Sequence, residues 1–305
     1  MVDEAAAAGA EAVALPEFFT TGACFDERLA GAALAEDGAA AEFLSDAAAR
    51  HDILLGGSFL CRDTDGEVRN AYLLAGPDGS ILGRHDKDLP TCWENALYIG
   101  GSVDGVIDAD GLGVGAAVCW EFMRSGTARR LRSRVDLVMG GSNWWSIPAW
   151  PPAAVTSRLE NANIALAKTA PSVFGRYVGA PVAHGAIAGK FECPLPELPA
   201  ITFRGEFKGG SLIADADGEI LDFRPSRAGS GFAIAEVEAK SSVPAEDVPE
   251  KFWLHPRGVA SVCAWHTQRV LGRRWYARHV RGRAPLDLRW SEAKAASHPQ
   301  VASDP

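Results

Sequence analysis

Short apolar runs, many bounded by glycine, aspartate or proline, alternate with alanine-rich or amphipathic stretches along most of the chain. Continuous apolar runs of this length are typical of strands covered on both faces, whereas Ala, Leu and Phe at helical spacing predict helices. We therefore expect helices within residues 26–52 and 122–134. We expect strands at residues 12–18, 53–60, 70–76, 114–120, 135–142, 164–170, 209–215, 218–223 and 231–238.

The alternation of strands with helices predicts an α/β fold built from packed layers. Asp-Gly turn signals in DTDGEVRN, GPDGS and DADGEI add antiparallel hairpins. The chain opens directly on a helix, and a layered α/β domain usually begins with a strand, so we expect that one strand ahead of this helix is missing. From residue 245 the sequence becomes aromatic and basic. We predict a main domain at residues 1–244 and a C-terminal extension at residues 245–305.

Composition and charge narrow the function classes. The 305 residues are 47% apolar and 23% charged, and the formal net charge is −9. A negative chain lacks the basic face that nucleic acid or an anionic membrane requires, so neither is an expected partner. No apolar run approaches the ~20 residues of a membrane span. The six cysteines form no CxxC pair, which predicts free thiols in a reducing compartment and a cytoplasmic protein.

The stretch GLGVGAAVCWEFMRSGTARRL ends a predicted strand at Cys119 and begins a predicted helix directly after it. Free cysteines are among the most buried residue types, so one interpretation is a plain core residue. The other is a nucleophile, because backbone N–H groups at the start of a helix favour a thiolate and bind an oxyanion. A thiol is mostly un-ionised at neutral pH, so a nucleophile at this position needs a base.

Three further residues offer the remaining chemistry. Glu17 follows an apolar strand in AVALPEFFTTG, where burial would raise its pKa and suit it to general base catalysis; the alternative is a strand-end carboxylate facing water. Lys87 in GRHDKDLPT is either a solvated lysine or an ammonium turned toward Cys119, where it would stabilise an oxyanion. Glu94, seven residues later, could hold that lysine or orient a substrate.

No metal or cofactor is expected. The histidines and cysteines form no cluster with metal-ligand spacing, and the glycines form neither GxGxxG nor GxxxxGK[ST]. The tryptophans near the predicted site, which include Trp120 and Trp144, could line a substrate pocket, although buried aromatic residues are also ordinary core.

The segments LPEFF at Glu17, DKDLPT at Lys87 and VCWEF at Cys119, in this order, resemble the nitrilase superfamily of carbon–nitrogen hydrolases. The resemblance extends to SRLENANIALAKTA, FKGGSLIADADGEIL and GFAIAEVE, and covers roughly residues 5–240. It implies a Glu–Lys–Cys triad, with Glu94 as the family's additional glutamate. It also implies a four-layer α-β-β-α sandwich whose first family strand is missing here.

The resemblance implies a hydrolase that releases ammonia or amine and an acid from a small amide or nitrile through an acyl-thioester on Cys119. CWE and LPT resemble the nitrilase branch somewhat more, so amidase and true nitrilase both stay open. Two other readings remain: a Cys–His thiol enzyme, and a catalytically silent assembly or binding protein with the same fold. The family commonly forms dimers, so we expect a homodimer or larger homo-oligomer. The C-terminal extension is either a tail that crosses to a partner or an amphipathic helix on its own domain.

Overall fold

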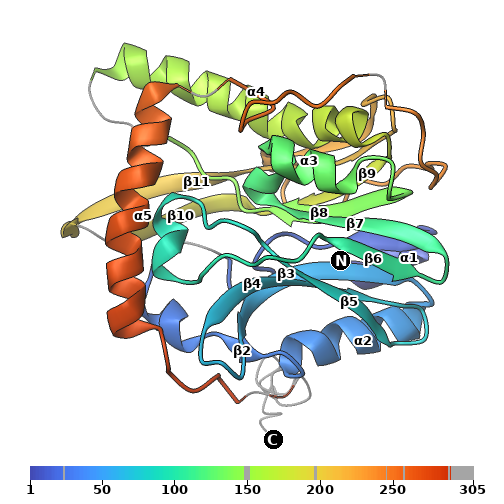
Figure 1. Ribbon diagram of the computed structural model, residues 1–305, viewed down its shortest axis with the longest axis horizontal. Helices are drawn as coiled ribbons and strands as arrows, with labels where there is room; N and C mark the ends of the chain where they lie inside the picture. Colours follow the sequence, from blue (N-terminus) through green and yellow to red (C-terminus); the bar gives the residue numbers. More distant parts are fainter. Residues whose placement is uncertain are drawn as a thin grey trace, which may run out of the picture.

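The computed structural model describes residues 1–22, 25–147, 152–195, 198–244, 246–256, 258–287 and 289. Two β-sheets lie face to face within this part of the chain, and helices cover their outer faces (Figure 1). The layer order is therefore α-β-β-α, and the predicted four-layer sandwich is confirmed. Cys24, predicted to be a free thiol, and residues 290–305 of the predicted C-terminal extension lie outside the described residues.

The first sheet takes its strands from the N-terminal third of the chain. Strand β1 runs parallel to β3, while β3, β4 and β5 form antiparallel hairpins, as the Asp-Gly turns predicted. Helices α1 (Val2–Ala7) and α2 (Ala39–His51) pack on its outer face. The strands are β1 (Ala12–Ala14), β2 (Leu34–Ala35), β3 (Leu54–Arg62), β4 (Val68–Ala75) and β5 (Ile81–Asp86).

The second sheet has three parallel strands, β7, β8 and β9, at its centre. Helices α3 (Ser125–Leu131) and α4 (Ala153–Val178) pack on its outer face. The long strands β10 and β11 form a hairpin at one end of the sheet. The strands are β6 (Val106–Ala109), β7 (Leu112–Val118), β8 (Leu137–Ser142), β9 (Val182–Ala186), β10 (Ala188–Leu195), β11 (Leu198–Ala214) and β12 (Ile220–Pro225).

The two sheets enclose an apolar core that ends at Cys119. Tyr72 and Leu74 from β4 pack against Val114 and Val118 from β7 in one cluster, which also contains Cys119. Strand β7 is thus held from both sides up to its last residue. The thiol is placed by a rigid strand rather than by a loose loop.

Two glycines allow the chain after β1 to cross the second sheet at very short range. A Cβ on Gly141 would lie 2.4 Å from the carbonyl oxygen of Leu15 and 2.7 Å from the backbone nitrogen of Glu17. A Cβ on Gly185 would lie 2.5 Å from the carbonyl oxygen of Ala14. Only a residue without a side chain fits at such distances. Glycines in β8 and β9 therefore determine how closely Glu17 approaches the second sheet.

Two predicted strands are wrong. Residues 164–170 lie inside α4, because alanine is the best helix former and Ala167, Ala170 and Phe174 form a buried stripe at helical spacing. An apolar run is ambiguous between a buried strand and a helix, and here the helical period decides. Residues 231–238 are in no strand.

The chain after residue 245 returns to its own domain. Helix α5 (Val259–His279) packs against the short 3-10 turn η2 (Cys92–Ala96), and Figure 1 shows the two side by side. A second 3-10 turn, η3 (Cys119–Met123), follows β7. Cys61, Cys92, Cys119, Cys193 and Cys263 are free thiols. No helix in the described ranges combines the length and the hydropathy that a membrane crossing requires.

Candidate active site

Glu17 lies where the chain leaves β1 and passes between the two sheets. Its side chain is fully buried, and its Oε2 accepts a hydrogen bond of 3.0 Å from the backbone N–H of Asn143, directly after β8. The next residue, Phe18, has φ of 53°, a left-handed conformation that is rare for a bulky side chain. The turn aims the glutamate inward, as the buried interpretation of LPEFF predicted.

Lys87 follows β5 and reaches between two carboxylates. Its Nζ lies 2.8 Å from Glu17 Oε1 and 2.7 Å from Glu94 Oε2, and all three side chains are fully buried. Lys87 is therefore turned inward and is not a solvated surface lysine. The Lys87 ammonium therefore bridges the two carboxyl groups.

Glu94 is fixed by contacts inside its own loop. Its Oε2 accepts a 3.0 Å hydrogen bond from the backbone N–H of Thr91 and a further hydrogen bond from the Tyr98 hydroxyl. Cys92, at the start of the same 3-10 turn, has φ of 47°. The carboxylate position thus depends on the backbone of residues 91–96.

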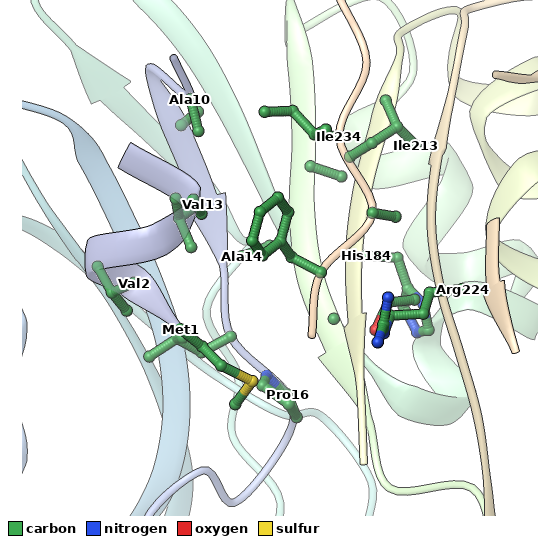
Figure 2. Close-up of a pocket in the computed structure, with 18 of the residues that line it drawn as sticks. Met1, Val2, Ala10, Val13, Ala14, Pro16, His184, Ile213, Arg224 and Ile234 are labelled. Carbon is green, nitrogen blue, oxygen red and sulfur yellow. The ribbon is translucent and has the colours of Figure 1, made fainter. Parts of the chain in front are cut away.

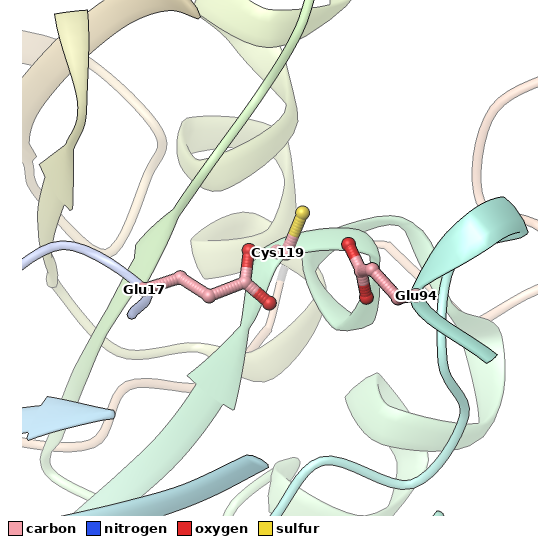
Figure 3. A group of neighbouring side chains, drawn as sticks. All are labelled: Glu17, Glu94 and Cys119. Carbon is pink, nitrogen blue, oxygen red and sulfur yellow. The ribbon is translucent and has the colours of Figure 1, made fainter. Parts of the chain in front are cut away.

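Cys119 is the last member of the cluster. It begins η3 at the end of β7 with φ of 53°, so the predicted strand-to-helical junction is confirmed, and its exposed fraction is 1%. Its sulfur and carboxylate oxygens of Glu17 and Glu94 all lie within 4.8 Å of one another. Figure 3 shows the two carboxylates approaching from opposite sides, with the thiol beside them. Strained backbone of this kind is typical of active sites.

Burial dominates the electrostatics. Burial and the Glu94 carboxylate raise the pKa of Glu17, and Lys87 opposes them, with a net pKa of about 7. Burial and the Glu17 carboxylate raise the pKa of the Cys119 thiol well above its ordinary value. Burial lowers the pKa of Lys87, but Glu17 and Glu94 outweigh it, and the net pKa lies well above its ordinary value. The resting cluster therefore combines a neutral thiol, an ammonium and a carboxyl group able to exchange a proton near neutral pH.

Sequence reasoning missed a side-chain partner of Glu17. Asn70, near the start of β4, is fully buried, and its Nδ2 donates a 2.8 Å hydrogen bond to Glu17 Oε1. Its backbone oxygen also accepts the N–H of Lys87 at 3.0 Å. The available signal was an asparagine at the start of the predicted strand NAYLLAG, since a buried amide needs a polar partner.

Behind the cysteine lies a second buried ion pair. Glu121 in η3 accepts the backbone N–H groups of Val118 at 2.9 Å and Asp88 at 3.0 Å, and pairs with His85 at 2.9 Å. Burial raises the pKa of Glu121, but His85, Arg130 and the Asp88 N–H lower it to about 2. Asp88 directly follows Lys87, so Glu121 connects the turn that begins at Cys119 to the loop that carries Lys87.

The cluster is an ion pair rather than a metal site in its present form. Glu17, Glu94 and Cys119 offer oxygen and sulfur atoms at short range, but the Lys87 ammonium already supplies the positive charge between the two carboxylates. The buried histidines of the described chain face elsewhere: His85 pairs with Glu121, and the Nε2 of His184 lies 2.8 Å from Ser142 Oγ.

The two predicted pocket tryptophans are placed differently. Trp120 adjoins the cysteine, is half-buried, and makes an edge contact with Trp253 at 5.4 Å between ring centroids. Trp144 packs against Met123 and α4, and its Nε1 donates a 2.8 Å hydrogen bond to Asn163. Trp120 is thus the nearer of the two to the thiol along the chain, while Trp144 packs as core.

A cavity of about 1280 Å³ opens at a different place, between β1 and residues 231–239. Figure 2 shows Val13 and Ala14 on one side and Ile234 and Ile213 on the other. Pro16 lines this cavity, but none of the four cluster side chains does. The cavity is therefore separate from the cluster.

Comparisons with known proteins agree with this geometry. The family model of carbon-nitrogen hydrolases matches residues 1–245. A carbon-nitrogen hydrolase from Helicobacter pylori is 18% identical, with a TM-score of 0.52 over 78% of this chain and 71% of that chain. A CN-hydrolase superfamily protein from Xanthomonas campestris, with an arsenic adduct in its active site, is 21% identical, with a TM-score of 0.51 over 73% and 79%.

A third solved structure is a mutant amidase from Nesterenkonia sp. that shows covalent addition of the acetamide moiety of fluoroacetamide at its active-site cysteine. It is 17% identical, with a TM-score of 0.53 over 74% of this chain and 77% of that chain. At these identities the three structures support the fold. No curated protein sequence matched the chain.

Proposed function

We propose a hydrolytic role for the buried cluster, from the premise that this chain belongs to the carbon–nitrogen hydrolase family, the nitrilase superfamily that its motifs predicted. The protein would hydrolyse non-peptide C–N bonds in a small amide or nitrile, with Cys119 as nucleophile. One observation carries the proposal: Glu17, Lys87 and Cys119, from distant parts of the sequence, converge in one buried cluster.

In the first half-reaction, Glu17 accepts the thiol proton while Cys119 Sγ forms a bond to the carbonyl carbon of the amide. The C=O electron pair moves onto oxygen, where the Lys87 ammonium and the backbone N–H of Trp120 stabilise the negative charge. The intermediate collapses, the C–N bond breaks, and the amine leaves with the proton from Glu17. An acyl-thioester remains.

In the second half-reaction, Glu17 removes a proton from water, and the hydroxide adds to the thioester carbon. The C–S bond breaks, the acid departs, and Cys119 recovers its proton. Glu94 does not exchange a proton in this scheme. It keeps Lys87 charged and oriented through the 2.7 Å ion pair.

The pKa shifts support this division of roles. A thiol whose pKa is raised by burial stays neutral at rest, so its proton must be removed as the C–S bond forms. A carboxyl group with a pKa of about 7 is suited to accept that proton and return it to the leaving group. Low exposure of all four side chains excludes bulk water, which strengthens each interaction.

For the substrate we propose a small amide first. The similar Nesterenkonia protein is an amidase, and a mutant of it carries the acetamide moiety of fluoroacetamide on its active-site cysteine, which supports a nucleophilic cysteine on this fold. A nitrile is the second candidate, favoured by the CWE and LPT sequences. It would react through a thioimidate, which two waters convert to the acid and ammonia.

The test is ammonia release from a panel of small amides, carbamoyl compounds and nitriles, with Cys119→Ala as the inactive reference. We expect release by the parent protein and none by a folded Cys119→Ala variant. Turnover retained in that variant would refute the nucleophile. If the parent releases no ammonia from any compound and iodoacetamide does not label Cys119 selectively, the silent assembly protein becomes the better description.

A further inference from the structure

The chain beyond the family match contacts two parts of the candidate site. The family model ends at residue 245, yet residues 252–254 and α5 pack against the turns that carry Cys119 and Glu94. We call residues 246–256 and 258–287 the C-terminal segment. Figure 1 shows its helix, α5, standing beside η2.

Helix α5 contacts η2 through a buried stripe at helical spacing. Trp265 Nε1 donates a 3.1 Å hydrogen bond to the carbonyl oxygen of Pro90, just before η2. About two helical turns further along α5, Gly272 packs directly against η2. A Cβ at Gly272 would stand 2.9 Å from the Ala96 nitrogen and 2.9 Å from Asn95 Cβ. The helix and the turn are therefore in close backbone contact, which only glycine permits.

Further along, α5 is anchored to the first sheet. The Tyr276 hydroxyl accepts a 2.8 Å hydrogen bond from the backbone N–H of Val68 and donates one of 2.7 Å to Glu67. Tyr276 also belongs to the apolar cluster that contains Trp93 and Ala96 of η2. The helix is thus fixed to β4 at one end and holds η2 along its length.

The residues before α5 contact the other turn. The backbone N–H of Leu254 donates a 2.8 Å hydrogen bond to Met123, and that of Ser125 donates 3.2 Å to Phe252. Trp253, between them, meets Trp120 at 5.4 Å and Trp265 at 5.9 Å between ring centroids. One aromatic chain therefore runs from the residue after Cys119 to α5.

We propose that the C-terminal segment is a positioning element of the active site: α5 sets where η2 holds Glu94 against Lys87, and residues 252–254 support the turn after Cys119. This inference rests on the proposed hydrolase function for its catalytic consequence. A five-residue 3-10 turn has few interactions of its own, so its placement depends on what packs against it. Glu94 acts through Lys87, and α5 acts through Glu94.

The test is Gly272→Ala, with Gly258→Ala as the matched control. Both add one methyl group to α5 or its N-cap, but the Cβ at Gly258 meets nothing within 4 Å, whereas the one at Gly272 meets the η2 backbone. Alanine is a better helix former than glycine, so Gly272→Ala does not weaken the helix itself. A displacement of ~1 Å in an active site lowers the rate by up to about 10²-fold. We therefore expect kcat/KM to fall at least ~5-fold in Gly272→Ala and to stay unchanged in Gly258→Ala.

A pH profile separates positioning from general damage. The groups that face Glu17 are Lys87, Cys119 and Glu94, with Tyr98 next to Glu94, and Glu94 raises the pKa of Glu17. Moving η2 away removes that effect, so the acid limb of the profile should shift to lower pH in Gly272→Ala. Loss of folded protein would lower the whole curve without moving the limb.

A second variant, Trp265→Phe, keeps an aromatic ring but removes the N–H donated to Pro90. It should shift the limb in the same direction by less. The proposal would be overturned if Gly272→Ala and Trp265→Phe both retained the kcat/KM and the pH profile of the parent protein. An equal loss of kcat/KM in Gly258→Ala would also overturn it. If the variants lose activity only at protein concentrations where light scattering shows a smaller assembly, α5 makes oligomer contacts instead. That result would also overturn the proposal. If the parent has no hydrolase activity, the proposed function fails separately, and the pH-dependent rate of Cys119 alkylation by iodoacetamide still tests the positioning.

Discussion

Asn70→Leu tests whether the acid–base behaviour of Glu17 depends on its buried hydrogen bonds. Asn70 Nδ2 donates 2.8 Å to Glu17 Oε1, and Asn70 Oδ1 has no hydrogen-bond partner among the described residues. Leucine has a similar size, so the substitution removes this donor and leaves Lys87 and the Asn143 N–H in place.

The expected size follows from the contact. A hydrogen bond to a charged group contributes about 1.5–3 kcal/mol, and one pKa unit corresponds to about 1.4 kcal/mol, so the pKa of Glu17 should rise by about 1–2 units. From a starting pKa of about 7, the ionised fraction at pH 7 falls from about a half to between about a tenth and a hundredth. The rate at pH 7 should therefore fall about 5- to 50-fold and recover at higher pH.

The assay is the pH dependence of Cys119 alkylation by iodoacetamide, which needs no knowledge of the substrate, followed by kcat/KM once a substrate is found. Asn70→Asp is the companion variant, because it places a third carboxylate beside Glu17 and should raise its pKa further. An acid limb that stays at the parent position in Asn70→Leu would refute the reasoning. A limb that moves to lower pH would contradict the assigned direction.

Three further substitutions have defined outcomes. Lys87→Met should lower kcat more than it weakens binding, measured by steady-state kinetics, and the opposite pattern would remove its oxyanion role. Gly141→Ala should lower the thermal midpoint and the activity together, because its Cβ would stand 2.4 Å from the Leu15 oxygen and displace Glu17; overpacking of this kind costs about 1–3 kcal/mol. The Glu121 carboxyl has a folded pKa of about 2 against 4.5, so it stabilises the protein above pH 4.5 and loses that contribution as pH falls toward 2; Glu121→Gln should flatten unfolding free energy across this window, and an unchanged acid dependence would contradict the ion pair with His85.

Much of the candidate site was predictable because each segment combines a local pattern with a familiar motif. LPEFF, DKDLPT and VCWEF each end or follow a strand, and strand ends from packed sheets meet at a common edge. The contribution of Asn70 was not predictable in this way. A single asparagine at the start of a predicted strand shows that a polar partner is required, but not which group it meets across the sheets.

The remaining differences come from tertiary contacts. Residues 164–170 are apolar enough for a strand, and packing of Ala167 and Ala170 against Met123 and Trp144 favours the helix instead. The position of α5 depends on Gly272 meeting the η2 backbone, and no local pattern at either segment indicates the other. Contacts between segments so far apart in the chain carry no signature in either one alone.

The most direct measurement is the location of the covalent intermediate. The protein would be mixed with a slowly turned-over amide, quenched in acid, and mapped by peptide mass spectrometry. We predict one acyl group on Cys119, lost in Glu17→Gln, with none on Cys263, although that thiol is exposed. An acyl group on another cysteine, or steady turnover with Cys119 mutated, would contradict the assignment of Cys119 as the nucleophile that Glu17 and Lys87 activate.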